Sequence, residues 1–111
     1  MTTGTILIVD ADREALKSLE YIVNSEFEKI ITISTPNRIN EILGKNDVDV
    51  VLLGTNFNSG VQNGNEGLFW MKEILKHDSN ISVVLITDSG DIELAVRAIK
   101  EGAVDFILKP W

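Results

Sequence analysis

Cysteine is absent from the 111-residue sequence, and His77 is its only histidine. The lack of cysteine excludes disulfides, thiolate catalysis and cysteine-based metal sites, and a single histidine argues against a histidine-built zinc site. No apolar run approaches the roughly 20 residues that cross a bilayer. The short apolar run that ends at Asp10 has no basic flank, so we recognise no signal peptide and expect a cytoplasmic protein without membrane contact.

Basic side chains are fewer than acidic ones. Lys and Arg number 10 against 17 Asp and Glu, which gives a formal net charge of −7. An acidic surface repels phosphate backbones, so we expect no direct contact with nucleic acid. The hydrophobic content of 44% in so short a chain suits one compact domain over residues 1–111.

Apolar runs recur at regular spacing and alternate with helical patterns. We predict buried strands at 5–9, 30–33, 48–53, 81–86 and 104–108. The inward stripes predicted for the intervening helices are Leu16, Leu19 and Val23; Ile39, Ile42 and Leu43; Leu68, Met71, Ile74 and Leu75; and Ile92, Ala95, Val96 and Ile99. This alternation predicts an α/β fold with a doubly wound, five-stranded parallel sheet.

Local signals place the helix ends. Asp10 or Asp12 can cap the first helix, which we expect to close near Phe27. Ser89 or Asp91 can cap the last one. Gly44 and Gly102 are expected to end the second and fourth helices, and the Gly- and Asn-rich stretch 54–67 is expected to be a loop, flexible between Thr55 and Gly64.

Polar or small residues follow four of the strands: Asp10, Gly54, Thr87 and Lys109. In a doubly wound sheet, function collects in the crevice beyond the carboxyl ends of the strands. These four positions are therefore the candidate site.

The run Ile6-Leu7-Ile8-Val9-Asp10, the segment Asn65-Glu66-Gly67-Leu68, and the stretch 95–110 (AVRAIKEGAVDFILKP) resemble the receiver domain of two-component response regulators. The resemblance covers essentially the whole chain. It implies a flavodoxin-like sheet of strand order 2-1-3-4-5, and a final helix after the fifth strand that is absent from this chain.

The same resemblance implies roles for the strand-end residues. In the family, an aspartate after strand three accepts a phosphoryl group, and an acidic cluster after strand one holds magnesium. A Thr or Ser and a Lys contact the phosphoryl oxygens, and Thr87 and Lys109 match these positions. Asp10 matches the outer acidic position, and Asp12 is a further carboxylate beside it.

Two positions depart from the family pattern. The acceptor position is Gly54, which has no side chain to phosphorylate, and the inner acidic position is Ala11. With those carboxylates missing, we expect no cofactor, and metal binding at Asp10 and Asp12 that is weak or absent. Lys109 has lost its usual partner, and a half-buried ammonium is costly unless paired, so we predict that Lys109 pairs with Asp10.

Simpler interpretations stand beside these. Asp10 and Asp12 can serve as helix caps, and Thr87 can be a turn residue. Phe106 occupies the family's aromatic switch position, but we favour plain packing there.

The resulting hypothesis is a degenerate receiver that acts in phosphorelay signalling and transcription regulation and is not an enzyme. The alternative is a conventional phosphorylatable receiver in which Gly54 is an engineered Asp-to-Gly change; Ala11, a second non-acidic position, argues against it. A flavin-binding protein on the same sheet is disfavoured, because Asp10-Ala11-Asp12 puts negative charge where a phosphate cradle belongs.

The Asn- and Gly-rich loop and the terminal Lys-Pro-Trp look most like receivers of sigma-54-type, NtrC-like transcriptional activators. That likeness implies a sensor histidine kinase as partner, and ATPase and DNA-binding effector domains in a longer regulator of which this chain is an N-terminal piece. Without a final helix, we expect the first and fifth strands to expose apolar surface, which favours self-association.

Overall fold

The computed structural model describes residues 4–55, 65–88 and 92–109. The strands are β1 (Thr5–Val9), β2 (Lys29–Ile33), β3 (Val50–Gly54), β4 (Ser82–Asp88) and β5 (Asp105–Lys109). The helices are α1 (Arg13–Val23), α2 (Ile39–Lys45, after a 3-10 turn at Pro36–Arg38), α3 (Asn65–His77) and α4 (Ile92–Lys100). Elements therefore lie close to where the apolar periodicity predicted them.

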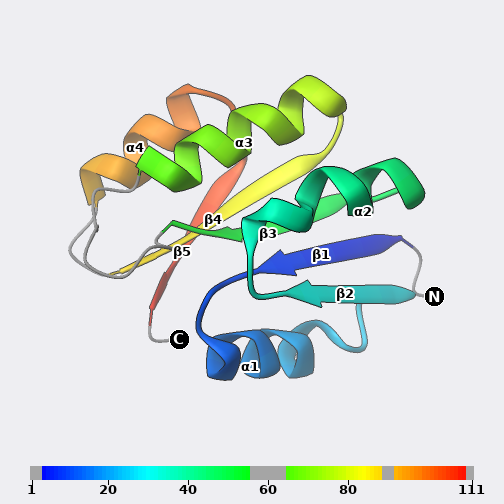
Figure 1. Cartoon of the computed structure of the whole chain (residues 1–111). Coiled ribbons are helices and arrows are strands. Elements are labelled where there is room, and N and C mark those ends of the chain that lie inside the picture. Colours follow the sequence, from blue (N-terminus) through cyan, green and yellow to red (C-terminus); the bar gives the residue numbers. More distant parts are fainter. Residues whose placement is uncertain (1–3, 56–64, 89–91, 110–111) are drawn as a thin grey trace.

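All strand pairs are parallel, and the order in the sheet is β2-β1-β3-β4-β5. Helix α1 covers one face, whereas α2, α3 and α4 cover the other (Figure 1). This is the predicted doubly wound arrangement. Because every strand runs in the same direction, the carboxyl ends meet at one edge of the sheet.

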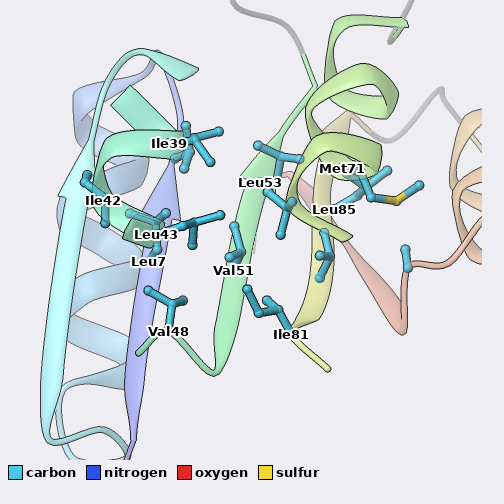
Figure 2. Close-up of a cluster of buried hydrophobic side chains, with 14 of the residues drawn as sticks. Leu7, Ile39, Ile42, Leu43, Val48, Val51, Leu53, Met71, Ile81 and Leu85 are labelled. Carbon is cyan, nitrogen blue, oxygen red and sulfur yellow. The ribbon is translucent and has the colours of Figure 1, made fainter. Parts of the chain in front are cut away.

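The hydrophobic core is split by the sheet into two layers. On β1, Leu7 and Val9 belong to the larger cluster beneath α2 and α3, in which Figure 2 shows Leu7. Ile6 and Ile8 belong to the cluster beneath α1. All four side chains are buried, as expected of a strand covered on both faces. The expectation that the first strand exposes apolar surface is thus wrong; the fifth, β5, is half-buried from Phe106 onward.

Helix ends agree in part with the local signals. The Asp12 carboxylate accepts a hydrogen bond from the Glu14 backbone N–H at 3.0 Å and caps α1. Helix α1 ends at Val23, earlier than the predicted closure near Phe27. Gly102 has a φ of +130° and follows α4 as predicted.

Gly44 does not end α2, because the helix continues through Lys45. The termination is instead made by Asn46, whose backbone N–H and side-chain Nδ2 both donate to the Ile42 carbonyl at 3.0 Å. Asn46 thus caps the last turn of α2 by hydrogen bonding, in place of the glycine in a left-handed conformation that the sequence predicted at Gly44.

The inward stripe predicted for α4 is wrong at three of its four positions. Ala95 and Ala98 are fully buried, but Ile92, Val96 and Ile99 are 49%, 46% and 42% exposed. The small alanine side chains occupy the buried face of α4, and the bulkier apolar side chains lie on its exposed face. The i, i+3, i+4, i+7 spacing identified the helix but did not determine which of its faces is buried.

Helix α3 begins at Asn65, so the last three residues of the predicted 54–67 loop are helical. The rest of that loop between 56 and 64, and the predicted caps Ser89 and Asp91, lie outside the described residues. None of the helices in the described ranges has the length and apolarity needed to cross a bilayer.

Candidate functional site

Sheet register brings the candidate residues together at one edge. Val9 pairs with Leu53, so Asp10 and Gly54 lie at the same level on neighbouring strands. On β4 and β5, Thr87 pairs with Leu108 and the next position pairs with Lys109. The structure therefore places Asp10, Gly54, Thr87 and Lys109 at the ends of four adjacent strands, as predicted.

Asp10 is held in place by its own backbone and by the start of α1. Its N–H donates to the Ile33 carbonyl at 3.2 Å, which extends the β1–β2 pairing past the last strand residue. Its Oδ1 accepts the backbone N–H of Asp12 at 2.9 Å. The side chain is only 4% exposed, so this carboxylate needs a counter-charge.

Lys109 supplies that counter-charge. Its Nζ lies 3.0 Å from Asp10 Oδ2 and donates a hydrogen bond to Oδ1 at 3.2 Å. The contact with Oδ2 is ionic without hydrogen-bond alignment, and no described residue donates to that buried oxygen. The predicted pairing of Lys109 with Asp10 is confirmed.

Gly54 leaves room for this pair. A Cβ built at position 54 would lie 3.2 Å from Asp10 Oδ2, 3.3 Å from Asp10 Cγ and 3.2 Å from the Val9 carbonyl oxygen. Few Cβ atoms in proteins are so tightly surrounded. The Asp10 carboxylate consequently lies against the point where a residue-54 side chain would begin.

Thr87 lies level with Leu108, next to Lys109 on the neighbouring strand, whereas Phe106 lies earlier on β5, level with Leu85. Thr87 is buried and takes part in an interaction within the structure. Phe106 is half-buried and packs against the larger core cluster, the contact expected of a plain packing residue.

The two carboxylates predicted for the acidic pocket each already have a partner within the protein. Asp12 is turned to the α1 N-terminus, where it caps the Glu14 N–H, and Asp10 is engaged by Lys109. Among the described residues, no group of three or more His, Cys, Asp or Glu side chains is arranged to hold a metal ion. The residues present do not fit the acidic magnesium site that the family pattern implies.

Sequence reasoning missed the close approach of α3 to this edge. Thr55, directly after β3, is buried. A Cβ on Gly67 in the first turn of α3 would lie 2.9 Å from Thr55 Cα and 3.2 Å from the Gly54 carbonyl oxygen. The signal was present, since a glycine early in an apolar helix often marks a close backbone contact.

The sequence matches the family described as response regulator receiver domain over residues 6–111. The C4-dicarboxylate transport transcriptional regulatory protein DctD of Rhizobium meliloti (strain 1021) is 30% identical over 107 residues, or 96% of this chain. The chain spans 22% of the length of DctD. The transcriptional regulatory protein FixJ of Bradyrhizobium diazoefficiens is 27% identical over 114 residues, and the match covers 51% of FixJ.

Solved structures agree with this assignment. The N-terminal signal receiver domain of a two-component system response regulator from Bacteroides fragilis is 42% identical, with a TM-score of 0.86, covering all of this chain and 87% of that one. The receiver domain of NtrX from Brucella abortus is 29% identical with a TM-score of 0.84, covering 96% of this chain and 86% of that one. The chain belongs to the response regulator receiver domain family.

Proposed function

We propose that this receiver domain is degenerate and acts in two-component signalling without phosphorylation at the end of β3. The observation that carries the proposal is the residue at that strand end: Gly54, which offers no carboxylate to a phosphoryl donor and lies against the Asp10–Lys109 pair. Thr87 and Lys109 match the positions that contact phosphoryl oxygens in the family. Gly54 and Ala11 replace the carboxylates that would accept phosphate and hold metal.

Phosphorylation by a small donor tests this proposal. The chain is incubated with acetyl phosphate and magnesium, and its intact mass is measured. We expect no stable gain of one phosphoryl group. The matched control is the double variant Ala11→Asp/Gly54→Asp, which restores both family carboxylates and is expected to take up phosphate. A stable phosphoryl adduct on the original chain would refute the proposal.

We further propose that magnesium binds weakly or not at all, and that no other cofactor is needed. Magnesium requires near-octahedral oxygen coordination. Here Asp10 is paired with an ammonium and Asp12 with a helix N-terminus, which supports the proposal. Calorimetric titration with magnesium chloride is expected to give no saturable heat, and a binding curve that saturates at low millimolar concentrations would contradict it.

The partners we propose are those of a transcriptional response regulator of the sigma-54 type in the cytoplasm: a sensor histidine kinase, and ATPase and DNA-binding domains in the same polypeptide. DctD carries the description of a transcriptional regulatory protein, and a longer structure of NtrX, of which this chain covers 24%, was solved in complex with ADP. Sequencing the coding region beyond Trp111 tests whether such domains follow.

Self-association is proposed through α4 rather than through the sheet. The exposed stripe of Ile92 and Val96 borders a hollow of about 330 Å³ that is also lined by Glu93, Arg97 and Lys100. In a two-fold antiparallel pairing of α4 helices, the acidic start of one helix would meet the basic end of the other, so the surface is complementary to itself.

A further inference from the structure

Asp10 and Lys109 come from strands that are not neighbours. In the order β2-β1-β3-β4-β5, the strands β3 and β4 lie between β1 and β5. Yet the Lys109 ammonium lies 3.0 Å from the Asp10 carboxylate. The lysine side chain therefore reaches back across the ends of two strands to meet it.

Position 54 lies on that route. Gly54 is level with Asp10 on the neighbouring strand, and a Cβ there would lie 3.2 Å from the same oxygen, Oδ2, that Lys109 contacts. A side chain longer than methyl would have to enter the space that the carboxylate and the ammonium share.

We propose that the Asp10–Lys109 pair is an internal clamp that occupies the strand-end site with the protein's own charges, and that it forms because residue 54 has no side chain. This inference deepens the proposed function, on which it rests in treating position 54 as the lost acceptor. Asp10 takes over as the counter-ion that a residue-54 carboxylate would provide for Lys109, and the clamp holds β1 and β5 in one relative arrangement.

Burial makes the pair interdependent. The Asp10 side chain is 4% exposed and the Lys109 side chain 26% exposed, so neither charge is well hydrated once its partner is removed. The ammonium and the backbone N–H of Asp12 both donate to Asp10 Oδ1, and of these two donors only the ammonium carries a charge. Loss of either partner should therefore weaken the fold more than loss of an exposed ion pair.

The clamp also determines what the site admits. An anion with phosphate-like oxygens would have to displace Asp10 from Lys109, and it would meet a buried negative charge while doing so. A carboxylate introduced by Gly54→Asp would compete with Asp10 for the same ammonium. This second consequence gives a test that does not involve phosphate.

The test is a pair of double-mutant cycles measured by urea unfolding, without magnesium or phosphoryl donor. Asp10→Asn, Lys109→Met and their combination are made in the original chain and again with Gly54→Asp. In the original chain we expect a coupling on the order of tenfold in the folding equilibrium constant. In the Gly54→Asp background, the coupling between positions 10 and 109 should fall to about twofold, the level typical of weak pairs. The same cycle on the exposed pair Glu41 and Lys45, whose charged atoms are 3.9 Å apart, is the control and should give about twofold in both backgrounds.

The clamp is refuted if the original chain shows no coupling between positions 10 and 109, or if Gly54→Asp leaves that coupling unchanged. If Asp10→Asn does not fold, amine labelling of the original chain followed by mass spectrometry decides. Clamped Lys109 should react more slowly than exposed Lys17, and Gly54→Asp should change its rate; equal rates for the two lysines would refute the clamp.

These outcomes are independent of the phosphorylation assay. Coupling together with a phosphoryl adduct would overturn the proposed function but leave the clamp. Absence of both would overturn the clamp and leave the proposed function.

Discussion

Two helical glycines provide a sharp test of how α3 is seated on the sheet, because the same substitution should have opposite effects on stability. Gly44 is an exposed residue of α2, and a Cβ added there would have no neighbouring atom within 4 Å outside its own helix backbone and chain neighbours. Gly67 lies in α3, where a Cβ would be 2.9 Å from Thr55 Cα and 3.2 Å from the Gly54 carbonyl oxygen.

The magnitudes follow from these surroundings. Gly44→Ala removes backbone freedom from the unfolded chain and should stabilise the fold by roughly 0.5–1 kcal/mol. Gly67→Ala receives the same benefit, but carbon atoms ordinarily pack about 3.5–4.0 Å apart. The neighbours it meets are backbone atoms of the adjoining strand end, so α3 must move, and overpacking of this kind costs about 1–3 kcal/mol. The net expectation for Gly67→Ala is a loss of about 1–2 kcal/mol.

Urea unfolding followed by far-UV circular dichroism measures both variants against the original chain. An unchanged denaturant slope shows that the midpoint shift reports stability. Thermal midpoints should move in the same directions, by about 4 °C per kcal/mol. The reasoning is refuted if Gly67→Ala is at least as stable as the original chain, because α3 would then not pack on the end of β3 as described.

Three further predictions concern other parts of the chain. Asp12→Ala should destabilise the domain by about 1 kcal/mol in urea unfolding, because the α1 cap on the Glu14 N–H is lost; Asp12→Asn should restore most of it, and equal losses would argue against capping. Val96→Glu should abolish concentration-dependent association in size-exclusion chromatography without lowering the unfolding midpoint, because Val96 is half-exposed on α4; association that persists would move the contact elsewhere. The hydrogen bond from Lys72 at 2.7 Å, helped by Arg97, lowers the pKa of Glu101 from its usual 4.5. Stability from a lowered carboxyl pKa is present above the unfolded value and is lost as the pH falls through the folded one, so Glu101→Gln should destabilise slightly at neutral pH and progressively less below pH 4.5; a difference independent of pH would contradict this assignment.

Much of the site could be read from residue order because parallel strands share one direction. Once the apolar runs were recognised as strands, the residues after them had to meet at one edge, and Asp10, Gly54, Thr87 and Lys109 do so. The pairing of Lys109 with Asp10 followed from their places at the strand ends, from the missing acceptor carboxylate at Gly54, and from the need of a half-buried ammonium for a partner.

The buried face of α4 and the end of α2 depended on contacts that form only in the folded structure. Nothing in the period of α4 told the buried Ala95 and Ala98 face from the exposed Val96 face, because both lie within one apolar arc. The choice was made by packing, which favours the small side chains where helix and sheet come closest. The end of α2 likewise depended on a contact in the folded structure. The helix does not end at Gly44, because the Asn46 side chain donates a hydrogen bond to the Ile42 carbonyl of the last turn.

At Gly54, the sequence determined one property and the folded structure determined another. Its place in the chain established that this strand end has no side chain for phosphate, because that conclusion needs only the identity of one residue. The distances came only from the folded structure: a Cβ at position 54 would lie 3.2 Å from the Asp10 carboxylate, and the Lys109 ammonium lies 3.0 Å from the same group. Such a contact joins residues 99 positions apart, and its distances are set by sheet twist and side-chain packing, which no local pattern encodes.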